Sequence, residues 1–296
     1  MKSSPPRRAA IAATVLTVAL AVAAASARPV AAAPGDLVAE VTTPEGSGPL
    51  WARGISPSVA FDGRYLYYVE YAGSVLHRID VPPAGGSSAA TGEVDVPITG
   101  APSGIMSIAY DAGRNVFWAV GGDGLSVYTL SAAGGATLVF RVDPASDRPG
   151  FEVRMYPAEI KVAYDRSDDT IWYSPDATTR IYHYQSSPDA LGTAALVTAT
   201  PYIDVDMAAE CGYSQSSGVA VGGGDLFVSI AGCPRYFEFT KTGTKVASFP
   251  MTLAAAGDLE CDSTSYAVSV IWVKDEFGGR IQAYEQPSPG ACVTGG

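Results

Sequence analysis

The sequence predicts an all-β protein whose strands form a five-bladed β-propeller. Three observations support this fold. A short phrase recurs five times, each copy is followed by further β-rich segments, and Gly, Asp and Ser separate the segments. The mean repeat length is about 50 residues, which is typical of a propeller blade. We therefore expect one blade for each copy of the phrase.

The recurring phrase reads Val-Ala-aromatic-Asp, and we interpret it as the innermost strand of each blade. Counted from their fourth positions, successive copies lie 49, 54, 57 and 40 residues apart. The fourth copy ends in Val-Gly, and the fifth replaces Ala and the aromatic residue by Glu and Cys. The five copies are residues 59–62, 108–111, 162–165, 219–222 and 259–262.

A second β-rich segment follows each phrase within a few residues, which predicts a hairpin. A third segment then carries two apolar residues three positions apart, such as Leu76 and Ile79, and this spacing is kept in all five repeats. The predicted second strands are residues 65–70, 116–120, 170–173, 226–230 and 269–274.

A fourth strand is predicted in four repeats, at residues 92–98, 137–142, 195–203 and 245–251. The fifth repeat has none before its Pro- and Gly-rich end. Residues 37–43 alternate Leu37, Ala39 and Val41 on one face, and we expect this N-terminal strand to close the last blade. The long segment between Gln185 and Ser217 leaves room for a degenerate sixth blade.

The N-terminus has the pattern of a secretory signal peptide. Lys2, Arg7 and Arg8 precede a charge-free, Ala-rich stretch at residues 9–27. Small-residue cleavage sites occur after Ala27 and after Ala33, and we expect residues 1–27 to be the signal peptide and 28–35 a flexible segment before one propeller domain at 36–296. The alternative is an uncleaved membrane anchor, which the abundance of Ala disfavours.

Charge and cysteine content indicate a protein that acts outside the cytoplasm. The formal net charge is −11, and no cluster of Lys and Arg is present, which argues against nucleic-acid binding. Four cysteines lie in the last third of the chain, and of the three ways to pair them we favour two local loops. The expected disulfides are Cys211–Cys233 and Cys261–Cys292.

The phrase, followed by a strand such as residues 73–80, resembles the propellers of the NHL, YVTN and gluconolactonase-like superfamily. The resemblance covers nearly the whole mature chain and concerns the repeat, with no catalytic motif matched. Members include calcium-dependent lactonases and a streptogramin lyase. The lactonase ligand set cannot be transferred, because Asn115 is the only asparagine here. His77 and His183, the two histidines, lie in third strands and match no catalytic histidine.

One departure from the repeat suggests a site. Glu260 stands where the other copies have alanine, Asp258 precedes it by two residues, and Glu159 lies just before the third copy. We expect Glu159, Asp258 and Glu260 to converge at the channel mouth on calcium or magnesium, since hard cations prefer carboxylate oxygens. The alternative is an acidic surface with Lys161 as its neutralising partner. The acidic loop with Asp165 is interpreted as a solvated turn.

The sequence thus favours an exported, monomeric propeller that acts as a binding or interaction scaffold. Its ligand is an unknown extracellular protein, carbohydrate or small molecule, and no membrane span is expected in the mature chain. The alternative is a metal-dependent lyase or lactonase-like enzyme with its site at the mouth of the central channel. Convergent charged groups there favour the enzyme, whereas a scaffold needs only a shaped surface.

Overall fold

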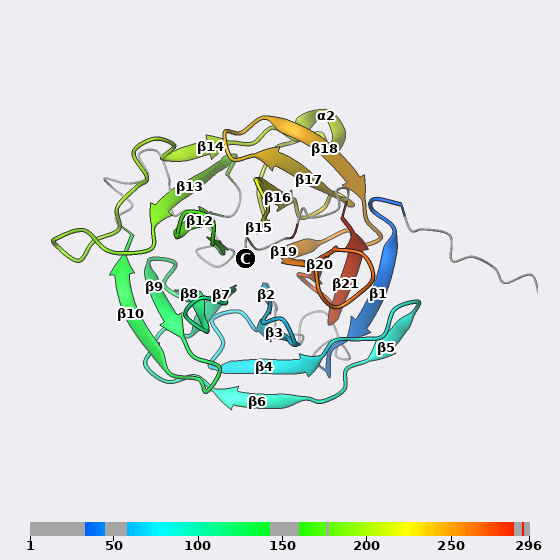
Figure 1. Cartoon of the computed structure of the whole chain (residues 1–296), viewed down its shortest axis with the longest axis horizontal. Helices are drawn as coiled ribbons and strands as arrows, with labels where there is room; N and C mark the ends of the chain where they lie inside the picture. The colour runs from blue at the N-terminus through cyan, green and yellow to red at the C-terminus, as the bar shows by residue number, and fades with distance from the viewer. Residues whose placement is uncertain (1–32, 45–57, 143–159, 176–177, 287–291, 293–296) are drawn as a thin grey trace, which may run out of the picture. The chain divides into compact units, whose positions relative to one another are not determined.

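Each copy of the recurring phrase forms the innermost strand of one sheet, and the sheets are arranged around a common centre (Figure 1). The sheets of blades one to four have four strands, and the sheet of blade five has five. The computed structural model describes residues 33–44, 58–142, 160–175, 178–286 and 292. The predicted signal peptide and Glu159 lie outside these residues. The innermost strands are β2 (Ser58–Phe61), β7 (Ile105–Asp111), β11 (Lys161–Asp165), β15 (Gly218–Gly222) and β19 (Ala256–Asp262).

The second and third strands of each blade form antiparallel ladders, as the hairpin pattern predicts. In blade one, for example, Leu66 lies opposite Ile79. From blade one to blade five the strand pairs are β3 (Tyr65–Val69) and β4 (Val75–Asp80), β8 (Val116–Gly121) and β9 (Ser126–Leu130), β12 (Thr170–Ser174) and β13 (Arg180–Gln185), β16 (Asp225–Ser229) and β17 (Arg235–Thr240), and β20 (Val270–Asp275) and β21 (Arg280–Glu285).

The outer strands of blades one to four are β6 (Val94–Pro97), β10 (Ala136–Arg141), β14 (Tyr202–Asp204) and β18 (Lys245–Pro250). Strand β14 is much shorter than the predicted 195–203, because a turn at residues 198–199 interrupts the ladder. The rest of the long segment before β15 contains one turn of helix, α2 (Ala208–Cys211). The described residues form five sheets, so the fold is a five-bladed propeller.

The ring closes through an N-terminal strand, as predicted. Strand β1 (Leu37–Thr42) pairs antiparallel with β21, with Val41 opposite Ile281. A short strand from blade one, β5 (Ser87–Ala89), adds to β1 in parallel, and this addition was not predicted. Figure 1 shows β1 and β5 side by side at the rim. Segments from blade one and the N-terminus therefore both cover the edge of blade five.

Five apolar clusters hold the blades together, one between each pair of neighbours. The innermost strands contribute to two clusters each because successive side chains point to opposite faces of a sheet. In blade one, Val59 packs toward blade five and Ala60 toward blade two. The alternating phrase thus supplies one small and one large apolar residue to adjacent interfaces.

The fourth-position aspartates of the phrase organise the hairpin that follows. In Asp111, Oδ1 accepts hydrogen bonds from the N–H groups of Gly113 and Arg114, while Oδ2 accepts one from Trp118 Nε1. Related pairs from carboxylate to ring are Asp62–Tyr67, Asp165–Trp172 and Asp262–Trp272. These bonds explain why the phrase ends in Asp and why Trp or Tyr follows.

Asp165 is therefore not a solvated turn residue, which corrects that part of the sequence interpretation. Its side chain is buried, accepts a hydrogen bond from Trp172 Nε1 and forms a salt bridge with Lys241 from blade four. Lys241 lies 76 positions further along the chain, so sequence spacing gave no sign of this pair.

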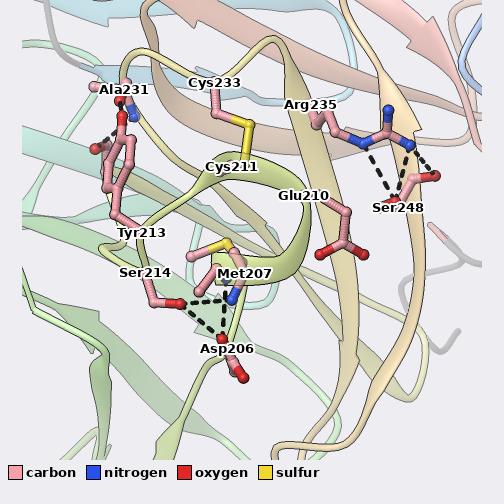
Figure 2. Close-up of a disulfide and its surroundings, with 12 residues drawn as sticks. Asp206, Met207, Glu210, Cys211, Tyr213, Ser214, Ala231, Cys233, Arg235 and Ser248 are labelled. Atoms are coloured by element: carbon pink, nitrogen blue, oxygen red, sulfur yellow. Dashed lines mark hydrogen bonds between the residues drawn. A yellow bond between two sulfur atoms is a disulfide. The ribbon is translucent and has the colours of Figure 1, made fainter.

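Both predicted disulfides are present. Figure 2 shows Cys211, at the end of α2, joined to Cys233 in the loop after β16, where Tyr213 also donates a hydrogen bond to the carbonyl oxygen of Ala231. The second bridge ties Cys292 to Cys261 of β19. Two disulfides fit an extracellular protein. Among the described residues there is no helix with the length and hydrophobicity needed to cross a membrane.

Candidate functional site

A layer of buried polar side chains closes the centre of the propeller. It consists of the residues directly before the phrase in four blades, Ser58, Ser107, Lys161 and Asp258, and we call it the axial belt. Each has a relative exposure of 0%. Because the innermost strands approach one another at the axis, residues up to 200 positions apart in sequence meet here.

Asp258 is the centre of the axial belt. Its Oδ2 accepts hydrogen bonds from Ser58 Oγ at 2.8 Å and from Ser107 Oγ at 3.1 Å. The same two hydroxyls accept hydrogen bonds from the N–H groups of Ile108 and Val162, respectively, in the next blade. A chain of hydrogen bonds therefore connects blades five, one, two and three around the axis.

Burial raises the pKa of Asp258 from 3.8 to about 7, while Lys161 and the two serine hydroxyls oppose this increase. A buried carboxylate is tolerated only when it is paired and hydrogen bonded. Asp258 meets this condition through the belt itself, so its contacts within the protein account for its presence.

Glu260 lies on the same face of β19, two residues closer to the end of the strand. Its neighbours along the axis include Ala109, Ala163 and Ala220, the equivalent residues of three other blades. Burial raises its pKa from 4.5 to about 8; hydrogen bonding from the Cys261 N–H opposes this increase, and the charges of Asp258 and Asp262 add to it. Glu260 nevertheless keeps part of its surface open.

That open surface faces a pocket at the carboxyl end of the innermost strands, which we call the mouth pocket. Its volume is about 120 Å³. The third residue of the phrase lines it in all five blades. Among the described residues, its lining is Phe61, Asp62, Gly63, Tyr110, Ala112, Tyr164, Arg166, Val221, Glu260, Cys261, Asp262, Ser263, Thr264 and Cys292.

The sequence predicted that Asp258 and Glu260 converge at the channel mouth, but the two carboxyl groups have different surroundings. Asp258 is sealed in the axial belt, whereas Glu260 reaches the mouth pocket. Glu159 lies outside the described residues. Among those described, no group of three or more His, Cys, Asp or Glu side chains is suited to holding a metal ion. The calcium or magnesium site stays a prediction that depends on Glu159.

The histidines lie in third strands, as expected, and away from the mouth pocket. His77 stacks on Tyr68 and its Nδ1 lies 2.8 Å from Asp95 Oδ1. His183 stacks on Trp172, and its Nε2 lies 2.6 Å from Thr170 Oγ1. Both rings are buried, and burial lowers the pKa of His183. Each histidine extends the stacked interior of its blade.

Sequence reasoning missed the aromatic wall of the mouth pocket. The signal was available, because the third position of the phrase is aromatic in three repeats. Tyr110 and Tyr164 pack between blades and also line the pocket. Arg166, an exposed residue of the hairpin after β11, carried no recognisable motif.

No protein-family model matches the chain, and no curated protein sequence matches it. Solved propellers are similar in structure. Glutaminyl cyclase from Myxococcus xanthus has a TM-score of 0.51 at 10% identity, over 84% of this chain and 97% of that one. A gluconolactonase from Xanthomonas campestris has a TM-score of 0.46 at 11% identity, over 78% of this chain and 86% of that one. At 10% identity, the similarity to the glutaminyl cyclase shows the propeller fold alone.

Proposed function

We propose that this protein is an exported binding propeller that captures a small molecule in the mouth pocket. The observation that carries the proposal is the common origin of the pocket lining. All five blades direct the third residue of their phrase to one cavity, and the axial belt closes the channel beneath it. A concave site with apolar walls and a few polar groups is the usual form of a small-molecule site.

Export is supported by the two disulfides and by the signal-peptide pattern of residues 1–27. It is tested by expressing the full chain in a bacterial host and measuring the intact mass of the exported protein. Cleavage after Ala27 or after Ala33 gives different masses. Recovery of uncleaved protein in the membrane fraction would contradict export and support the anchor instead.

Binding is tested by native mass spectrometry of the exported protein, compared with a Tyr164→Ala variant that enlarges and alters the pocket. We expect a small molecule to co-purify with the wild-type protein and to be lost from the variant. A matched control is Tyr202→Ala, because Tyr202 is exposed on β14 and does not line the pocket. Equal retention by all three proteins would place the ligand elsewhere and contradict the proposal.

A second candidate function is an enzyme with its site at the mouth pocket. It is favoured by Glu260, since a carboxyl group with a pKa of about 8 gains and loses protons near neutral pH. The predicted metal dependence is tested by calorimetric titration with calcium and magnesium. Heat no larger than that of dilution would remove the metal-dependent form of this candidate.

A further inference from the structure

Tyr110 and Tyr164 present their aromatic rings, and not their hydroxyl groups, to the mouth pocket. Tyr110 Oη donates a hydrogen bond to Asn115 Oδ1 at 2.8 Å, and Tyr164 Oη donates one to Asp169 Oδ1 at 3.0 Å. Neither acceptor lines the pocket. The two hydroxyl groups are therefore held outside it, and the rings, together with Phe61, form its apolar surface.

Acidic residues outnumber basic ones in the described lining of the mouth pocket. The acidic residues are Asp62, Glu260 and Asp262, and the basic residue among those described is Arg166. Two of the acids also fix the local backbone, since Asp62 accepts hydrogen bonds from backbone N–H groups of its hairpin and so does Asp262. Their positions are thus set by the fold. An anionic ligand would meet more repulsion than attraction here.

Glu260 supplies a carboxyl group at the base of these rings. One of its oxygens, Oε1, accepts a hydrogen bond from the Cys261 N–H at 3.0 Å, which fixes the side chain against its own strand. The equivalent alanines of the other blades leave space around it. An acidic group beside aromatic rings is a combination that attracts a weakly hydrated organic cation.

We propose that the ligand of the mouth pocket is an organic ammonium cation whose methylated head contacts the rings of Phe61, Tyr110 and Tyr164 and pairs with Glu260. This inference rests on the proposed binding function and names its ligand class. A volume of about 120 Å³ admits a compact head group, so any larger part of the ligand extends into solvent. Ser263 also lines the pocket and can contact such a part, whereas the Thr264 hydroxyl donates a hydrogen bond to Asp262 Oδ1.

Pairing with Glu260 links binding to pH. The groups that face Glu260 are Asp258 beneath it, Asp262 on its own strand, and Asp62, Tyr110 and Arg166 across the pocket. Since burial raises the pKa of Glu260 to about 8, the cation has to displace a proton at pH 7. Affinity should therefore rise between pH 6 and pH 9, with Asp258 acting in the same direction.

The test uses three probes of one shape that differ in charge. Choline is the cation, 3,3-dimethyl-1-butanol is its neutral isostere, and 3,3-dimethylbutanoate is the anion. Each probe is titrated into the exported protein while the backbone amide signals of Tyr110, Tyr164 and Cys261 are followed by NMR. We expect choline to shift these signals and to bind at least tenfold more tightly than the neutral isostere.

Glu260→Gln should reduce choline affinity about tenfold and leave only the smaller rise with pH that comes from Asp258, while binding of the neutral isostere stays unchanged. Glu238→Gln is the matched control, because Glu238 is also buried and its pKa is also raised, yet it lies in β17 outside the pocket lining. Circular dichroism and thermal unfolding confirm that both variants are folded.

Each outcome bears on the proposal in a different way. Equal affinity for choline and the neutral isostere overturns the cation inference, and so does tighter binding of the neutral or the anionic probe than of choline. In both cases the mouth pocket would still bind a small molecule. Absence of any shift with all three probes also overturns it, and the co-purification experiment then decides separately whether the pocket binds a ligand. Loss of choline binding in Glu238→Gln would show that the effect does not arise from the mouth pocket.

Discussion

Replacing Glu260 by Gln should make the protein more stable at alkaline pH. In the folded protein the pKa of Glu260 rises from 4.5 to about 8, so the folded state holds this proton more tightly than the unfolded state does. Its contribution to the free energy of unfolding is greatest below pH 4.5, falls as pH rises to about 8, and is constant above that value. Glutamine keeps the shape and does not titrate.

The size of the effect follows from the same numbers. Each pKa unit corresponds to about 1.4 kcal/mol, so the full change would be roughly 5 kcal/mol. Because part of the Glu260 side chain is open to the pocket, solvent screens its charge, and we expect about 2 kcal/mol. Titrating groups remote from Glu260 are present in both proteins and cancel in the comparison, whereas Asp258 interacts with Glu260, so the measured difference includes this coupling.

Urea denaturation followed by tryptophan fluorescence at pH 4 and pH 9, without reductant, measures this difference. The variant should match the wild-type protein at pH 4 and exceed it by about 2 kcal/mol at pH 9. Glu93→Gln, at an exposed position, should show no such change between the two pH values. A Glu260→Gln protein whose stability differs from wild type equally at both pH values would refute the reasoning.

Three further perturbations test the fold. Trp172→Phe keeps the stacking surface but removes the hydrogen bond to Asp165, and should lower the free energy of unfolding by about 1–2 kcal/mol in chemical denaturation; no loss would mean that the bond is not structural. Replacing Cys261 and Cys292 together by Ser should cost about 2–4 kcal/mol, measured without reductant, and an unchanged denaturation midpoint would contradict the role of the bridge. Deleting β1 exposes the edge of β21, and size-exclusion chromatography should then show aggregation; a monodisperse, fully stable product would show that closure is dispensable.

The sequence predicted the blades because a blade is built from local pairing. Successive strands are joined by short turns, so a phrase repeated every 50 residues or so carries most of the information needed for one sheet. The two disulfides were predictable for the same reason, since each closes a local loop. Strand β14 was the exception: residues 195–203 have the composition of a strand, but the turn at 198–199 interrupts the pairing.

Only the tertiary structure decided what happens at the axis. The sequence marked Asp258 and Glu260 as neighbours in one strand and gave them one predicted role. Ring closure brings Ser58 and Ser107 onto Asp258 and leaves Glu260 open to the mouth pocket. Contacts between residues 151 and 200 positions apart have no local signature, because they depend on the number of blades and the angle between them. The repeat therefore determined the blades, and closure of the ring determined which carboxyl group lines the mouth pocket.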